Sequence, residues 1–117
     1  PELAAGMIHE IIGPNANPEG KQIAIASMAS APASTYQACV EAIVTFEERA
    51  NLGQIKVPTM CLVGEFDTNA PPAMMERMAS KIPGATFVVL PGLGHLPNLE
   101  NPAAFDAAML GFLRGLD

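Results

Sequence analysis

The sequence lacks tryptophan, has one tyrosine and two cysteines, and carries only 6 lysines and arginines against 12 aspartates and glutamates. Its net charge of −6 argues against nucleic acid and anionic membranes as partners, because their phosphates attract clusters of basic side chains. We find no signal peptide and no apolar run long enough to cross a bilayer. Two cysteines do not suggest a disulfide framework. We therefore expect a cytoplasmic protein in which Cys39 and Cys61 are small core residues.

Apolar residues, in contrast, are abundant. Half of the 117 residues are hydrophobic, which is enough for a packed core and too much for a disordered chain. The length fits one domain or a piece of one. Because the first residue is Pro1 and not methionine, we expect the chain to start at a cut or a gap.

Residues 1–51 have helical patterns and no strand signal. A first helix is expected to end at Gly13-Pro14, and residues 15–20 have the composition of a loop before a short apolar segment at 23–28. Ser34 is expected to cap a further helix, with Gln37 as its capping-box partner. The apolar stripe of that helix contains Tyr36, Cys39, Val40, Ile43 and Val44.

Residues 52–117 alternate between strand and helix. The apolar runs 57–63 and 86–90 are typical of parallel strands buried on both faces. Pro71-Pro72 opens a helix between them, and Asn101 caps a last helix that starts at Pro102. We expect the core-facing residues of the last helix to be Phe105, Ala108, Met109, Phe112 and Leu113. A two-stranded parallel sheet is not stable alone, so other strands must lie beside it.

Two residues with acid–base chemistry follow these strands at equivalent places. Asp67 comes after the first strand, and His95 comes after the second in a loop that contains Gly92 and Gly94. Function in open α/β sheets lies at the carboxyl ends of the strands, where an aspartate can orient a histidine base. The simpler interpretation is a loop histidine and an aspartate that caps its own loop. Both residues together, at matching strand ends, favour catalysis.

The remaining candidates are weaker. Glu65 is a second choice for the orienting carboxylate, Glu100 is expected near the start of the last helix, and His9 is expected to be solvated or to rim a pocket. No Gly-x-Ser-x-Gly elbow, and no cysteine or aspartate version of it, occurs in the sequence. We expect no metal and no cofactor, because no His, Cys or Asp cluster has the spacing of metal ligands.

From Ile55 onward the sequence resembles the carboxyl-terminal part of α/β-hydrolase-fold enzymes. The motifs that carry this resemblance are 55–59, 63–67 and 70–72, followed by 82–85, 94–98 and 100–102. The resemblance implies an α/β fold that contains the last two parallel strands and their flanking helices, preceded by cap-domain helices. It makes Asp67 the acid and His95 the base of a catalytic triad, with residues 52–117 as the core part and 1–51 as the cap.

Residues 36–43, with Phe46 and Arg49, resemble the end of the cap in 3-oxoadipate enol-lactonase-like hydrolases. This resemblance implies a serine-type hydrolase of small esters, enol-lactones or related carbonyl substrates. A related alternative is a hydrolase that cuts carbon–carbon bonds of ring-cleavage products. We expect the cap to roof an apolar pocket above His95, with a small apolar-to-mixed substrate. The expected substrate contacts are Met7, Tyr36, Val40 and Leu96.

Two classes of function remain open. The first is a hydrolase completed by an amino-terminal fragment of the same protein, which would carry the nucleophile and the oxyanion hole. The second is a non-catalytic remnant or binding module. Retention of both Asp67 and His95 favours the hydrolase, because a binding module has no need of that pair. The substrate, the type of nucleophile and the oligomeric state stay open.

Overall fold

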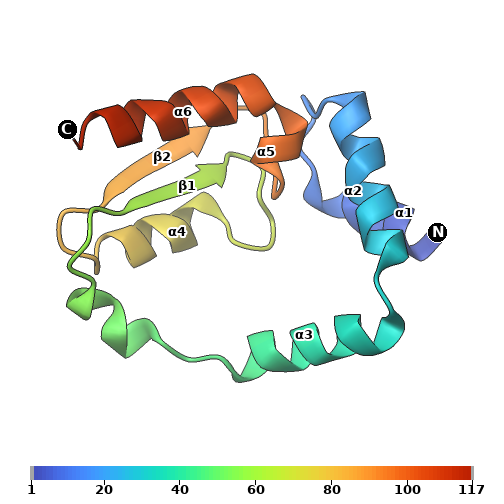
Figure 1. Ribbon diagram of the computed structural model, residues 1–117, viewed down its shortest axis with the longest axis horizontal. Coiled ribbons are helices and arrows are strands. Elements are labelled where there is room, and N and C mark those ends of the chain that lie inside the picture. The colour runs from blue at the N-terminus through green and yellow to red at the C-terminus, as the bar shows by residue number, and fades with distance from the viewer. Residues whose placement is uncertain (1, 117) are drawn as a thin grey trace.

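The computed structural model describes residues 2–116, in which helices flank a small parallel sheet (Figure 1). The elements are, in chain order, α1 Glu2–Ile11, α2 Pro18–Ser30, α3 Ala33–Thr45, the 3₁₀ helix η1 Arg49–Gln54, β1 Met60–Gly64, α4 Pro72–Ala79, β2 Thr86–Leu90, α5 Pro97–Glu100 and α6 Pro102–Arg114. No helix among residues 2–116 is both long and apolar enough to span a membrane. The predicted alternation of strand and helix over residues 52–117 is confirmed, whereas η1 and α5 were not predicted.

The sheet consists of β1 and β2, which run parallel with Met60 opposite Thr86 and Gly64 opposite Leu90. Helix α4 covers one face and packs on both strands, while α6 packs on β2 from the other face (Figure 1). The main core lies on the α4 side, where Cys61 is buried beside Ile82. The first strand starts at Met60, later than the predicted Val57, because Pro58 cannot donate to the ladder.

The last helix begins as predicted. Pro102 is its first residue, and the Asn101 side chain accepts the Ala104 N–H at 3.1 Å. Its apolar face is less buried than predicted: no residue of α6 is fully buried, and Leu113 is 47% exposed. The described part of the sheet is too narrow to cover that face.

The first two helices pack against the second half of the chain. Helix α2 contacts both α1 and α5, and a Cβ atom on Gly20 would lie 1.8 Å from the Leu99 carbonyl oxygen. The start of α2 differs from the prediction of a loop over 15–20. Asn17 accepts the Glu19 N–H at 2.9 Å and Pro18 is the first helical residue, so what looked like loop composition is a helix cap.

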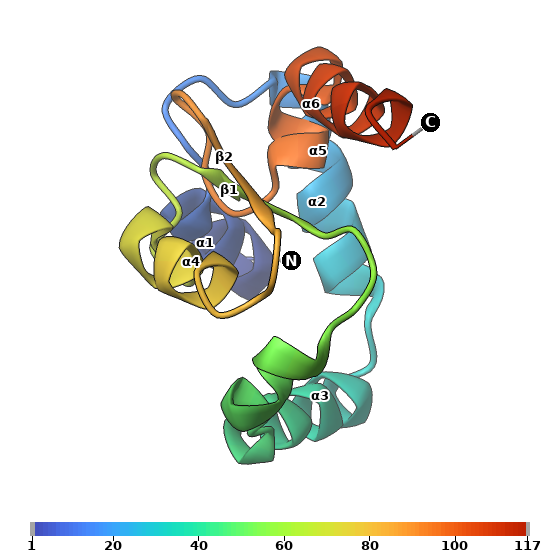
Figure 2. The same ribbon diagram turned by 90° about the vertical axis from the view of Figure 1, so that its left-hand side faces the viewer.

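Helix α3 lies away from the sheet and from α6 in both views (Figures 1 and 2). All of its residues are exposed, including Ile43 at 73%. Two predictions about this helix are wrong. Its N-cap is Pro32, and not Ser34, whose side chain makes no capping bond. Cys39 is exposed and not a core residue.

Candidate active site

The parallel register brings the ends of the two strands, and the loops that follow them, together. The Glu65 N–H donates to the Leu90 carbonyl at 3.0 Å, and the Phe66 N–H donates to the Leu93 carbonyl at 2.8 Å. Loop 65–71 and loop 91–96, which we call the histidine loop, therefore form one surface at the carboxyl edge of the sheet.

Asp67 lies on this surface with its carboxylate held by the backbone. Its side chain is 7% exposed, and its Oδ1 atom accepts the N–H groups of Asn69 and Ala70, each at 2.9 Å. Its Oδ2 atom lies 2.9 Å from Nδ1 of His95. One carboxylate oxygen thus fixes the loop, and the other faces the imidazole.

His95 is aimed by the backbone of the histidine loop. Gly92 has φ +73°, in the left-handed region that favours glycine, and a Cβ atom on Gly94 would lie 2.3 Å from the Ile11 carbonyl oxygen. That same carbonyl accepts the His95 N–H at 2.7 Å. Gly92 therefore has the turning role that the sequence predicted, whereas Gly94 allows the histidine loop to approach the backbone of Ile11 closely.

The outer side of the imidazole remains open. The His95 side chain is 37% exposed, and its Nε2 atom has no hydrogen-bond partner within residues 2–116. A neutral ring that donates its Nδ1 hydrogen to Asp67 keeps a lone pair on Nε2, which can accept a proton. The pair has the geometry of an oriented base next to solvent-accessible space.

Glu65, the second candidate for the orienting carboxylate, has another partner. Its Oε2 atom accepts the Gly92 N–H at 2.8 Å, so it ties the two loops together. The carboxylate that is hydrogen-bonded to His95 belongs to Asp67 and not to Glu65. The structure thus favours the first-ranked residue.

The predicted position of Glu100, near the start of the last helix, is confirmed, because Glu100 directly precedes Asn101, the N-cap of α6. Its hydrogen bonds were not predicted. Glu100 ends the short helix α5, and it is 2% exposed. Its carboxylate accepts three backbone N–H groups, those of Gly13, Gly94 and Leu96. One of these donors, Gly13, is 87 positions away in the sequence. The residues next to Glu100 therefore do not reveal that its side chain is buried.

The four residues predicted to contact substrate lie in different places. Met7 and Tyr36 line a groove of about 220 Å³ between α1, α2 and α3, where the Tyr36 hydroxyl lies 3.9 Å from the Met7 sulfur. Val40 is 40% exposed and does not line this groove, and neither does His95. Leu96 is half-buried beside His95. The groove and His95 are thus separate features of the described surface.

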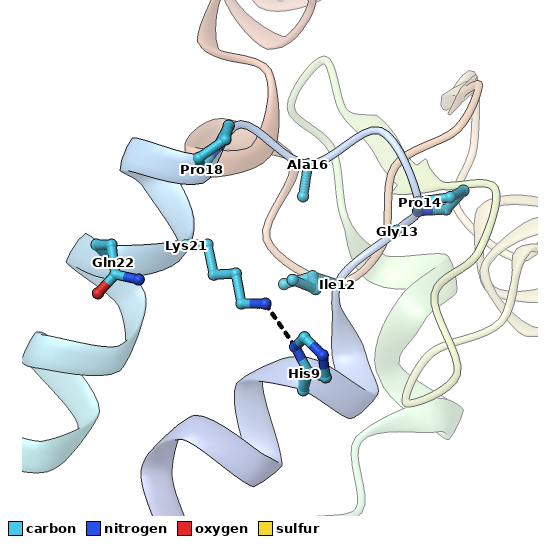
Figure 3. Close-up of a pocket in the computed structure, with 8 residues that line it drawn as sticks. All are labelled: His9, Ile12, Gly13, Pro14, Ala16, Pro18, Lys21 and Gln22. Atoms are coloured by element: carbon cyan, nitrogen blue, oxygen red, sulfur yellow. Dashed lines mark hydrogen bonds between the residues drawn. The ribbon is translucent and has the colours of Figure 1, made fainter. Parts of the chain in front are cut away.

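A larger hollow of about 560 Å³ lies between the end of α1 and the start of α2 (Figure 3). His9 rims it, as the sequence allowed, with its Nδ1 atom 2.5 Å from Nζ of Lys21. His95 does not line this hollow. Within residues 2–116, no group of three or more His, Cys, Asp or Glu side chains could hold a metal ion.

Comparison with known proteins identifies the family of the chain. A family model described as "Alpha/beta hydrolase family" matches residues 11–108. The chain is similar to 3-oxoadipate enol-lactonase 1 of Acinetobacter baylyi, with 30% identity over 95 residues, which cover 81% of this chain and 35% of that protein.

Solved structures give the same result. A thermophilic esterase from Thermogutta terrifontis is 32% identical with a TM-score of 0.87, over 97% of this chain and 43% of that chain. The enol-lactonase from Burkholderia xenovorans LB400 is 26% identical with a TM-score of 0.87, over 97% of this chain and 44% of that chain. The chain spans between 4% and 35% of the length of the curated relatives that it matches.

Proposed function

The chain belongs to the alpha/beta hydrolase family, and from this premise we propose that Asp67 and His95 are the acid and base of a serine-type hydrolase. The substrates would be small esters, enol-lactones or related carbonyl compounds. The observation that carries the proposal is the 2.9 Å contact between the buried Asp67 carboxylate and Nδ1 of His95, with the other side of the ring open. The similarity to an esterase and to enol-lactonases supports the choice of substrates.

The proposed reaction has two proton transfers at Nε2 of His95. In the first half, a nucleophile hydroxyl attacks the substrate carbonyl and gives its proton to Nε2, which passes it to the leaving oxygen as the ester bond breaks. In the second half, water attacks the acyl group, loses a proton to Nε2 and releases the acid. The proton then returns to the nucleophile. Asp67 holds the tautomer and stabilises the imidazolium throughout.

The nucleophile and the oxyanion hole would come from an amino-terminal part of the same protein. The 117 residues contain no nucleophile elbow, and the described sheet has only two strands. Two parallel strands leave unpaired N–H and C=O groups on their outer edges, which further strands would pair. The small share of the relatives' length that the chain covers supports this arrangement.

Residues 1–51 would act as the cap. The apolar stripe of α3 is exposed. Its residue Tyr36 lines the groove between α1, α2 and α3 together with Met7. We assign Leu96, which is adjacent to His95, to a contact with the reacting part of a small, mostly apolar substrate, and we assign Met7, Tyr36 and Val40 to the cap that selects the substrate. The protein would act in the cytoplasm, an assignment that rests on its two unpaired thiols.

The test compares the chain alone with the chain produced together with its amino-terminal part. Turnover of a p-nitrophenyl ester and a circular-dichroism melt are measured for both, and intact mass shows whether two pieces associate. We expect turnover and a cooperative melt only for the completed protein, and loss of nearly all turnover in its His95→Ala variant. Turnover by the chain alone, or a completed His95→Ala variant with activity close to wild type, would refute the proposal.

A further inference from the structure

Glu100 is a buried carboxylate to which the reaction above assigns no task. It is 2% exposed and forms no ion pair with any residue from 2 to 116. A buried charge without a counter-ion is costly unless hydrogen bonds compensate it. Every buried side-chain polar atom among these residues has a hydrogen-bond partner, so the carboxylate is compensated by its backbone donors. The identity of those donors indicates its role.

Two of the donors are the residues on either side of His95. The Gly94 N–H donates to Oε2 of Glu100 at 2.7 Å, and the Leu96 N–H donates to Oε1 at 2.9 Å. Hydrogen bonds to an ionised acceptor are stronger than those between neutral groups. The carboxylate therefore holds the backbone immediately before and after His95, and with it the direction of the imidazole.

The third donor belongs to the connection between α1 and α2. The Gly13 N–H donates to the same Oε2 atom at 2.8 Å. The last residue of α1, Ile11, accepts the His95 N–H through its carbonyl at 2.7 Å. The carbonyl of Glu100 itself accepts the Asn17 N–H at 2.7 Å. One residue thus joins the histidine loop to a distant segment of the chain, since Gly13 and Glu100 are 87 positions apart.

The two oxygens of a glutamate side chain fit these donors, and the closest substitutes do not. Oε2 receives two N–H groups and Oε1 receives the third, so all three bonds need two acceptor oxygens. A glutamine has one acceptor oxygen, and its NH₂ group would face at least one of the N–H donors. An aspartate is one methylene shorter and cannot reach both sides of the site.

We propose that Glu100 is a positioning residue that fixes His95 by tying its two flanking amides to the α1–α2 connection. This inference rests on the proposed function, because it concerns the direction in which His95 presents Nε2. Positioning errors of about 1 Å can lower a rate on the order of 10²-fold. Loss of the carboxylate should therefore reduce turnover with little effect on the binding of a small ester.

The experiment uses the completed protein and compares Glu100→Gln with Asn101→Ala. The control removes the neighbouring cap of α6 and weakens the fold without a contact to the histidine loop. We expect kcat of Glu100→Gln to fall on the order of 10²-fold, with KM nearly unchanged. The low-field proton resonance of the His95 ring N–H should also move. Asn101→Ala should lower the melting temperature and leave kcat and that resonance as in wild type.

A folded Glu100→Gln protein with wild-type kcat would overturn the inference, and so would an equal loss of kcat in Asn101→Ala. Wild-type protein gives a readout that needs no variant. The amide hydrogens of Gly94 and Leu96 should exchange slowly with solvent although they lie in a loop, and rapid exchange would overturn the inference. Failure of the proposed function is distinguishable, because then His95→Ala would retain activity. Failure of this inference alone leaves His95→Ala inactive.

Discussion

Replacement of Asp67 by asparagine tests the proposed base most directly, because the structure determines which way the new amide must lie. Two backbone N–H groups, those of Asn69 and Ala70, point at Oδ1 from 2.9 Å. The amide oxygen must occupy that place. The opposite orientation would leave both donors facing an NH₂ group, at about 1–3 kcal/mol for each unsatisfied donor.

The NH₂ group of the new side chain then lies at the position of Oδ2, 2.9 Å from Nδ1 of His95. Because NH₂ can only donate, Nδ1 becomes the acceptor and the ring hydrogen moves to Nε2. A ring protonated at Nε2 cannot take the proton of the nucleophile. We expect a loss on the order of 10⁴-fold in kcat, as for the corresponding change in other triads. That loss corresponds to about 5.5 kcal/mol of transition-state stabilisation.

The assay is steady-state turnover of an activated ester by the completed protein, with thermal melts of each variant. Asp67→Asn has nearly the shape of the original side chain, so its melt should stay close to wild type. The matched control is Glu65→Gln, which changes the neighbouring carboxylate that binds Gly92 instead of His95. Its activity should stay within a few-fold of wild type. An Asp67→Asn variant that keeps a tenth or more of wild-type kcat would refute this reasoning, and a loss confined to Glu65→Gln would identify the other carboxylate as the orienter.

Three further results are expected. If the groove beside α3 selects the substrate, Met7→Ala should change the activity ratio between short and bulky esters, and a constant ratio would make that groove part of the scaffold. Burial raises the pKa of the Cys61 thiol. At neutral pH a disulfide reagent should therefore react first with the exposed Cys39, and with Cys61 only after denaturation. Rapid reaction of both thiols in the native protein would contradict the burial of Cys61. A Cβ atom at Gly64 would lie 2.1 Å from a backbone oxygen of the histidine loop, so Gly64→Ala should lower stability of the completed protein by about 1–3 kcal/mol in a denaturant melt. Gly111→Ala is its control, because no atom of residues 2–116 lies within 4 Å of a Cβ there, and equal melts for the two variants would show that the contact is relaxed.

Several parts of the fold were predictable because they depend on local chemistry. Asn101 and Pro102 mark the start of α6 by a side-chain cap and a fixed φ, which are properties of a few neighbouring residues. The parallel pairing of β1 and β2 follows from the strand–helix–strand order. The pairing of Asp67 with His95 follows in turn, since parallel strands end at the same edge.

The errors occurred where similar local chemistry permits two outcomes. Asn17 and Pro18 have the composition of a loop and also that of a helix start, and the structure uses them as a start. The stripe with Cys39 has the period of a buried helix face, but the period does not supply a partner to pack on it. Periodicity therefore predicted the helix and not the burial of its apolar face.

By itself, the sequence determined the family, the order of the elements and the two residues that meet at the end of the sheet, because each depends on short motifs and strand order. Only the tertiary structure decided the role of Glu100, since its hydrogen bonds join Gly13 to the loop around His95. It also decided that Asp67, and not Glu65, faces the imidazole. Hydrogen bonds between segments distant in the chain depend on how those segments fold against each other, and no local pattern of residues encodes them.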